Sequence, residues 1–515
     1  MNKEQILWAD DEIDLLKPHI LFLQNKGYEV TTVTNGRDAL DAISQQNFHL
    51  IILDENMPGI SGLEALQQIK IAQPNVPVIM ITKSEEENIM NQAIGSEIAD
   101  YLIKPVNPMQ ILLSIKKNLH SEALVAQKAT SDYQQEFMSI SQQIAMARTI
   151  DDWYQLYNTL VRWELTLSNA ETGMADMLRM QKQEANSAFA KMVKRNYEKW
   201  VTTDDHPLMS NEIFKTQIFP HIDAGEKVCF IVIDNFRLDQ WRTISPLLND
   251  YFNIEKEELY TTILPTATQY ARNAIFSGLM PIDIERMFPE LWVDEDEDEG
   301  KNLNEAPLIQ TILDRYRRKC KFSYNKLNDS AAGERLVQHF AQLKNFDLNV
   351  IVFNFVDILS HARTESKMIR ELAYTDEAYR SLTVTWFKNS YVLEIFKRIA
   401  EQGWKIVLTT DHGTTRVDNA IKVIGDKKTN TNLRYKVGKN LSYNPRQVYE
   451  IKQPKRFGLP LLNVSSTYIF ASGRDFFAYP NNYNHYVQYY NDTFQHGGIS
   501  MEEMLVPLIT LTPKK

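Results

Sequence analysis

The sequence predicts a multidomain α/β protein in which two α/β domains flank an all-α helical domain. Its 515 residues exceed what a single hydrophobic core usually organises. Short apolar strands alternate with helical segments towards both ends of the chain, whereas the middle shows apolar residues at helical spacing only. We therefore expect three domains, at residues 1–121, 122–206 and 207–515.

Composition narrows the class of protein. With 43% apolar and 24% charged residues, and no apolar run near the roughly 18 residues that cross a bilayer, we expect a globular chain without a membrane span. The acidic opening, MNKEQILWADDE, is unlike a signal peptide and favours a cytoplasmic location. Cys229 and Cys320 lack CxxC-like spacing, which argues against a disulfide framework or thiolate metal site. A net charge of −10 opposes indiscriminate binding to nucleic-acid phosphates.

The first domain is expected to be a doubly wound parallel sheet. Its five predicted strands are Gln5–Ala9, Glu29–Val33, Leu50–Leu53, Val78–Ile81 and Asp100–Ile103. In the middle domain, apolar residues from Tyr133 to Trp200 recur at the spacing of a helix face and predict three or four helices. Thr149 with Asp152 marks one helix start, because both side chains can satisfy free amides of a first turn.

Strand and helix alternation returns after residue 207 and predicts a second, larger α/β domain. Its predicted strands are Val228–Ile233, Val350–Phe355, Lys405–Thr409 and Thr467–Ala471. Two irregular stretches interrupt it, the acidic run Asp294–Glu299 and the basic run Lys422–Arg456. Both are expected to be surface insertions.

Polar side chains follow the strands of the first domain, where open α/β sheets place their sites. Asp10 and Asp11 follow the first strand and Asp54 follows the third. Thr82 follows the fourth strand and Lys104 the fifth. Converging carboxylates repel one another unless a hard cation such as Mg²⁺ neutralises them. Asp54 is then the candidate nucleophile for a phosphoryl group, with Lys104 and Thr82 placed to bind the added oxygens.

These motifs resemble the receiver domains of response regulators over about residues 1 to 120. The matching elements are the acidic pair, LDENMPGISG around Asp54, ITK at Thr82 and DYLIKP at Lys104. The resemblance implies a flavodoxin-like fold and phosphorylation of Asp54 by a sensor histidine kinase. It also implies a magnesium pocket formed by Asp10, Asp11, Asp54 and the Asn56 carbonyl. Finally, it implies a conformational switch formed by Thr82, Tyr101 and Lys104.

Carboxylate and imidazole groups, the ligands of a metal such as Zn²⁺, follow the strands of the last domain. Asp234 follows the first of these strands. Asp357 and His361 lie four residues apart, a spacing that puts them on one face of a helical turn. The remaining candidates are Asp411, His412 and, near the end of the chain, His496. A single strand-end Asp or His is weak evidence, whereas the whole set indicates a metal centre.

This set resembles the alkaline phosphatase superfamily, in particular its PglZ branch, over about residues 207 to 515. The resemblance implies two zinc ions. One would take Asp357, His361 and His496, and the other Asp234, Asp411, His412 and the nucleophile. The nucleophile falls within LPTATQYARN, where the second threonine, Thr268, is preferred to Thr266. Arg272 is either a partner of a phosphate oxygen or an arginine on the helix surface near the site.

Two metal ions can lower the pKa of the Thr268 hydroxyl and stabilise the leaving oxygen of an in-line displacement. Phosphatases, phosphodiesterases and mutases share this frame, but a threonine nucleophile resembles the diesterase branch. The basic run Lys422–Arg456, interleaved with tyrosines, suits a short oligonucleotide, and a solvated loop remains the alternative. The acidic run Asp294–Glu299 is expected to be a solvated loop.

The order of the three parts resembles response regulators of type IX secretion in Bacteroidetes. That resemblance implies a sensor kinase of the PorY kind, an extracytoplasmic-function sigma factor as partner, a phosphorylation-dependent homodimer and an anionic phosphodiester substrate. Direct promoter DNA binding is disfavoured, because no helix-turn-helix pattern follows the receiver. The alternative function is a non-enzymatic interaction platform for a sigma factor or secretion component, with a structural metal site.

Overall fold

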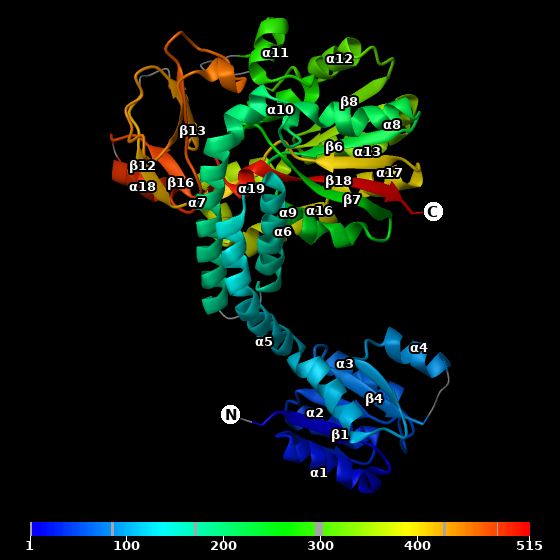
Figure 1. Ribbon diagram of the computed structural model, residues 1–515. Coiled ribbons are helices and arrows are strands. Elements are labelled where there is room, and N and C mark those ends of the chain that lie inside the picture. The colour runs from blue at the N-terminus through cyan, green and yellow to red at the C-terminus, as the bar shows by residue number, and fades with distance from the viewer. Residues whose placement is uncertain are drawn as a thin grey trace. The chain divides into compact units, whose positions relative to one another are not determined.

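The computed structural model describes residues 3–83, 87–168, 172–293, 302–425, 429–481 and 483–514. The chain divides into two compact units, residues 1–131 and 132–515 (Figure 1). Helix α5, Pro108–Met146, runs without a break through residues 121 and 122. The predicted domain boundaries therefore stay predictions. Among the described residues, every helix is too short or too polar to span a bilayer.

The first unit is the doubly wound parallel sheet that the sequence predicts. Its strand order is β2-β1-β3-β4-β5, with all neighbours parallel. The strands are β1 Gln5–Ala9, β2 Glu29–Val33, β3 Leu50–Leu53, β4 Val78–Thr82 and β5 Asp100–Ile103. The helices before α5 are α1 Lys17–Asn25, α2 Gly36–Gln45, α3 Gly62–Ala72 and α4 Glu87–Gly95. Separate apolar cores fill the two faces of the sheet, as expected for a sheet buried on both sides.

The start of α3 fixes the loop that follows β3. Ser61 and Glu64 form a reciprocal capping box that satisfies free amides of the first turn. Gly62 lies so close to this loop that a Cβ atom there would meet the Asp54 carbonyl oxygen at 2.3 Å. Only glycine permits this approach without displacing the backbone of Asp54.

The helical region continues from α5 into α6, Ile150–Thr166, and α7, Thr172–Thr202. Helix α6 begins after Thr149, whose side chain forms the predicted capping box with Asp152. The apolar faces expected from the sequence are buried, including Trp153, Phe189 and Tyr197. Helices α6 and α7 belong to the same compact unit as the last domain.

The last domain is built on a six-stranded sheet of order β7-β18-β10-β6-β9-β8. Strands β10, β6, β9 and β8 are parallel, and β18 runs antiparallel between β10 and β7. Their bounds are β6 Val228–Ile233, β7 Phe252–Thr261, β8 Phe322–Leu327, β9 Leu348–Phe353, β10 Lys405–Thr409 and β18 Leu505–Pro513. The strand predicted at 350–355 ends two residues early, because Asn354 and Phe355 begin a helix.

Helices pack around this sheet, and the small-sheet strands β12, β13 and β16 lie together on one side of it (Figure 1). The helices are α8 Phe219–Asp223, α9 Leu238–Ile244, α10 Thr268–Ser277, α11 Pro281–Met287, α12 Glu305–Arg315, α13 Ser330–Gln338, α14 Phe355–Glu365, α15 Lys367–Leu372, α16 Asp376–Asn389, α17 Tyr391–Glu401, α18 Tyr483–Tyr490 and α19 Met501–Met504. The short strands are β11 Thr415–Val417, β12 Asn419–Lys422, β13 Tyr435–Gly438, β14 Tyr449–Ile451, β15 Thr467–Phe470, β16 Asp475–Ala478 and β17 Thr493–Gln495.

The basic run Lys422–Arg456 is not a purely surface insertion, so that expectation is wrong for part of it. Strands β13 and β14 flank β15 in a three-stranded sheet. Arg434 and Lys436 are buried, and Tyr435 packs edge-on against Tyr270 with ring centroids 5.9 Å apart. The acidic run Asp294–Glu299 lies outside the described residues.

Candidate functional site

The receiver carboxylates converge as the strand order requires. Asp10 and Asp54 are buried at the ends of adjacent strands β1 and β3, while Asp11 is exposed. One carboxylate oxygen from each of the three lies within 4.8 Å of the others. This is an oxygen-only donor set, open on the side of Asp11, of the kind that Mg²⁺ prefers.

Lys104, which follows β5, offsets part of the negative charge of this pocket. Its Nζ lies 2.6 Å from Asp54 Oδ2 and 2.8 Å from Asp10 Oδ2. Burial alone would lower the pKa of Lys104, but the hydrogen bonds to both carboxylates raise it, so the side chain stays charged. Burial also raises the pKa of Asp10, an effect that Lys104 partly offsets.

The other predicted receiver residues surround the same point. Thr82 is buried at the end of β4, next to β5. The backbone amide of Asn56 lies 3.4 Å from Asp54 Oδ1. Tyr101, on β5, is half-buried and packs against the apolar core on one face of the sheet. The structure therefore places six of the predicted receiver residues at the carboxyl ends of the strands, whereas Tyr101 lies within β5 and packs against the core.

In the last domain, the six predicted ligands form two clusters of three. Asp357, His361 and His496 make one cluster, and Asp234, Asp411 and His412 make the other. Within each cluster, the ligand atoms lie within 4.8 Å of one another. The clusters adjoin, because the rings of His412 and His496 stack with centroids 4.2 Å apart.

The imidazoles of His412, which is buried, and of His496, which is partly buried, are held in orientations that suit metal ligands. His496 Nδ1 lies 3.1 Å from the Thr266 carbonyl oxygen, and His412 Nδ1 lies 3.1 Å from the Gly413 carbonyl oxygen. Each ring can donate through Nδ1 and leave Nε2 free for a cation. Burial lowers the pKa of His496 well below its usual range, which favours the neutral form that binds metal.

The two threonines of the Pro-Thr-Ala-Thr element have different surroundings. Thr268 is the first residue of α10, and its Oγ1 lies 3.1 Å from His412 Nε2 and 3.4 Å from Asp234 Oδ1. Thr266 Oγ1 instead donates to the Gly498 carbonyl at 3.0 Å and accepts from the Gly497 amide at 2.9 Å. Thr268 therefore faces the ligand clusters, whereas Thr266 anchors the loop of His496.

Arg272 is neither on the helix surface nor free for a phosphate oxygen. Its guanidinium is fully buried, pairs with Asp234, and lies 3.0 Å from Asp411 and 3.1 Å from Glu305. Burial raises the pKa of Asp234 well above its usual range and Arg272 only partly offsets this. Burial would also raise the pKa of Asp411, but Arg272 and His412 together lower it. Arg272 thus favours the charged form of Asp411 and offsets part of the burial effect at Asp234, a positioning role that the sequence did not indicate.

Asn235 is a further residue that the sequence did not single out. Its Nδ2 donates to Asp357 Oδ1 at 3.1 Å, and its backbone amide lies 3.4 Å from Asp411 Oδ1. It is fully buried and has a φ of +61°, a conformation that asparagine tolerates better than most residues. Asn235 therefore contacts both clusters at once. The only signal for it was its position directly after Asp234.

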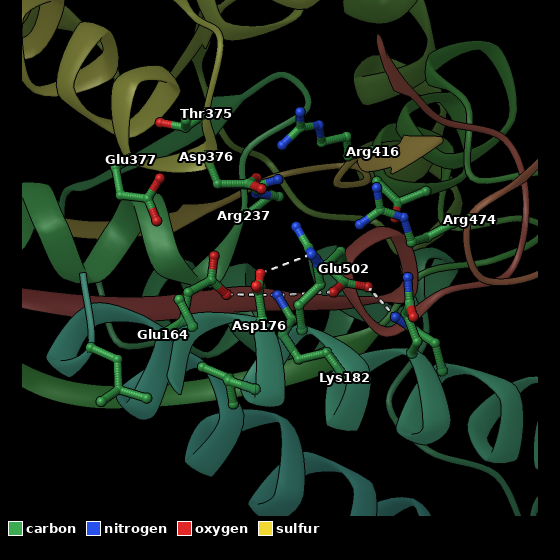
Figure 2. Close-up of a pocket in the computed structure, with 17 residues that line it drawn as sticks. Glu164, Asp176, Lys182, Arg237, Thr375, Asp376, Glu377, Arg416, Arg474 and Glu502 are labelled. Atoms are coloured by element: carbon green, nitrogen blue, oxygen red, sulfur yellow. Dashed lines mark hydrogen bonds and ion pairs between the residues drawn. The ribbon is translucent and has the colours of Figure 1, made fainter. Parts of the chain in front are cut away.

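A buried charge network connects α6 and α7 to the ligand loops (Figure 2). Lys182 of α7 lies 2.6 Å from Glu164 of α6 and 3.2 Å from Glu502, six residues after His496. Asn186 of α7 donates to Glu502 at 2.9 Å. The helical region is therefore tied to the segment that carries His496, although no sequence motif predicted this contact.

Family comparisons agree with this geometry. Residues 213–511, more than half of the chain, match the family described as the BREX system PglZ alkaline phosphatase-like domain. The chain therefore belongs to the PglZ alkaline phosphatase-like family. Residues 6–116 match the response regulator receiver domain, and residues 123–201 match the PorX response regulator linker domain. Together these matches give the three-part architecture of PorX-like response regulators.

Individual relatives match the receiver region. The transcriptional regulatory protein ResD of Bacillus subtilis (strain 168) is 32% identical over 115 residues, which are 22% of this chain and 48% of ResD. The uncharacterized transcriptional regulatory protein YkoG of the same organism is 34% identical over 121 residues, 23% of this chain and 52% of YkoG. The chain thus spans about half the length of these relatives. A CheY-like receiver structure from Methanospirillum hungatei JF-1 is 28% identical, covering 23% of this chain and 96% of that one, with a TM-score of 0.23.

Proposed function

We propose that this protein is a response regulator in which phosphorylation of Asp54 controls a zinc-dependent phosphodiesterase in the last domain. The observation that supports an enzymatic output is the position of Thr268 Oγ1 beside His412 and Asp234. A purely structural metal site has no need of a hydroxyl at that point. The domain division at 121/122 and 206/207 is part of the same proposal.

The donor sets fit two zinc ions in the last domain and one Mg²⁺ in the receiver. When bound, the zinc ions would lower the pKa of the Thr268 hydroxyl and polarise the phosphoryl group. Asp357, His361 and His496 would hold one ion, and Asp234, Asp411, His412 and Thr268 the other. In the receiver, Asp10, Asp11, Asp54 and the Asn56 carbonyl would hold Mg²⁺.

The chain's own residues account for the rest of the reaction. Thr268 is the first residue of α10, where free backbone amides and the positive end of the helix favour an anionic oxygen. Arg272 pairs with both Asp234 and Asp411, holds both carboxylates in place and favours the charged form of Asp411. Attack by Thr268 on the phosphorus would give a phospho-threonine intermediate and release one alcohol, and water would then free the threonine.

The proposed substrate is a nucleotide or short oligonucleotide phosphodiester. A diester carries only one charge at its phosphorus, and a threonine nucleophile resembles the diesterase branch of the superfamily. Tyr435 is buried, so it offers no base-stacking surface, and substrate contacts from the basic run must come from its exposed residues.

Partners follow from the response-regulator class. A receiver domain implies a histidine kinase, here proposed to be of the PorY kind, acting in the cytoplasm. Contact with an extracytoplasmic-function sigma factor, control of type IX secretion, and a homodimer formed on phosphorylation complete the proposal. In the receiver, Thr82, Tyr101 and Lys104 would report the phosphoryl group to the rest of the unit.

The experiment compares full-length wild type, Thr268→Ala and Thr268→Ser. Zinc content and hydrolysis of bis-(p-nitrophenyl) phosphate and p-nitrophenyl phosphate are measured with and without acetyl phosphate. We expect zinc-dependent diester turnover that falls about a thousandfold or more in Thr268→Ala and partly returns in Thr268→Ser, with zinc retained in both. Zinc-loaded wild type without turnover in either state would instead indicate an interaction platform.

A further inference from the structure

A cavity of about 380 Å³ lies along α7, on the side of the small sheets. One wall comes from α7, including Lys191 and Lys194. The other comes from Asn419, from the turn at Arg446 and from the segment Ser472–Asp475. None of the proposed metal ligands lines this cavity, so it is separate from the metal centre.

The charge of the lining contrasts with that of the chain. Lys191, Lys194, Arg446 and Arg474 contribute four positive charges, against one carboxylate, Asp475. The whole chain carries a net charge of −10. A surplus of positive charge that lines a concave space raises the local concentration of anions.

Three of these cations have no carboxylate partner in the part of the chain that the structure describes. Arg474 lies 2.8 Å from Asp418, but Lys191, Lys194 and Arg446 make no ion pair there. Lys194 is half-buried and has only a 3.4 Å contact with the Val448 carbonyl. Burial lowers the pKa of Lys194, an effect that the charge of Asp475 only partly offsets.

A hydroxyl in the same wall is also without a partner. Among the described residues, the buried Oγ of Ser472 has no hydrogen-bond partner. A buried hydroxyl usually finds one, so the Ser472 hydroxyl is a hydrogen-bonding group in this wall that no described residue uses. Asp475, the one acid of the lining, accepts from Asn419 Nδ2 at 2.6 Å, so one of its oxygens is already engaged.

We propose that this cavity binds a compact phosphate-bearing anion. Lys191 and Lys194 supply point charges, and Arg446 offers the fork of donors that fits phosphate oxygens. The described lining residues include no aromatic ring, so the cavity has no surface on which a nucleobase can stack. Recognition therefore rests on phosphate groups, either of a free inorganic oligophosphate or within a nucleotide strand.

The cavity wall is joined to the segment that carries His496. Ser472 pairs with Ile499, and the Gly473 amide donates to the Ile499 carbonyl at 2.8 Å. Ile499 lies three residues after His496. An anion that orders this wall therefore acts on a proposed metal ligand from outside the metal centre. This binding site goes beyond the proposed hydrolase, because it needs no chemistry at the metals.

The test is calorimetric titration of full-length protein with inorganic pyrophosphate, before and after treatment with a zinc-selective chelator. The variants are wild type, the double variant Lys194→Gln with Arg446→Gln, and the single variant Lys191→Gln. Arg195→Gln removes one charge from α7 at a residue outside the cavity lining, and serves as the matched control. A parallel titration uses a dinucleoside monophosphate, which has a phosphodiester but no terminal phosphate.

We expect one equivalent of pyrophosphate to bind after chelation, about tenfold or more weakly in the double variant and about threefold more weakly in Lys191→Gln. The control should bind as wild type does. Binding of the dinucleoside monophosphate as well would identify the source as a nucleotide strand, and binding of pyrophosphate alone as a free oligophosphate. Loss of all pyrophosphate binding on chelation, or an equal affinity in wild type and double variant, would overturn the proposal.

Discussion

The acid pocket of the first unit and the ligand clusters of the second both lie at the carboxyl ends of parallel strands, but different cations balance their carboxylates. In the receiver, Lys104 meets Asp10 and Asp54, and Asp11 stays exposed. In the last domain, the fully buried Arg272 pairs with two ligand carboxylates, those of Asp234 and Asp411. An open pocket suits a group that must reach another protein. The buried cluster of Asp234, Asp411 and His412, called the closed frame below, suits an ion that stays bound, whereas His361 of the adjoining cluster is 59% exposed.

The largest expected effect concerns the open pocket. Asp54→Asn keeps the shape of the side chain but removes the nucleophilic oxygen, so labelling by acetyl phosphate should disappear completely. Phosphate-affinity electrophoresis of the full-length protein measures this. Glu55→Gln, one residue along, should label as wild type does. Undiminished labelling of Asp54→Asn would show that another residue accepts the phosphoryl group.

The next effect concerns the closed frame. A zinc-selective chelator should lower the unfolding midpoint of the second unit, because ligand bound only to the folded state at about a thousand times its Kd contributes about 4 kcal/mol. The receiver, which offers oxygen ligands only, should unfold at the same temperature with and without the chelator. Differential scanning calorimetry separates the two transitions. An equal shift of the unfolding midpoint in both units, or no shift in either, would mean that the two units do not differ in their dependence on zinc.

A smaller effect tests how the helices support the closed frame. Lys182 is 19% exposed and pairs with Glu164 and Glu502, so Lys182→Met leaves both acids without this partner. We expect a loss of about 3 kcal/mol in the free energy of unfolding of the second unit. Arg179→Met, on the same helix but in an exposed pair with Asp176, should cost under about 1 kcal/mol. Equal losses in the two variants would mean that the ion pairs of Lys182 contribute no more to the free energy of unfolding than the exposed pair of Arg179.

Much of the fold could be predicted because buried strands are short, apolar and bounded by polar residues. Gln5–Ala9 and Val228–Ile233 match the structure at both ends for this reason. Strand β7 was missed because its middle, from Asn253 to Glu258, is exposed and lacks the apolar pattern. The strand predicted at 350–355 ran too far because Phe355 and Val356 continue an apolar run that the backbone turns into α14.

The same reasoning explains what could be predicted of the sites. Ligands such as Asp234 and Asp411 follow buried strands directly, so local sequence indicates them. Arg272 and Lys182 each pair with one acid more than a hundred residues away in the sequence, Asp411 and Glu502 respectively. No spacing along the chain reports such pairs, because the sheet topology alone brings them together.

The finest test concerns Asn235, which contacts both ligand clusters. Removal of a side chain that orients metal ligands lowers metal affinity by about 10–100-fold. Asn235→Gly is the suitable variant, because glycine accepts the positive φ of +61° and only the side-chain amide is lost. We expect zinc to be held about 10–100-fold more weakly, measured by competition with a chromogenic chelator.

Asn249→Gly, at an exposed position of the same domain, provides the control and should leave zinc affinity within about twofold of wild type. If Asn235→Gly binds zinc as tightly as wild type, the amide does not hold Asp357 in place, and Asp357 is oriented by the first turn of α14 and Asp411 by the end of β10. The metal centre would then resemble the receiver pocket more closely, since both would depend on the elements that carry the ligands rather than on a residue that bridges them.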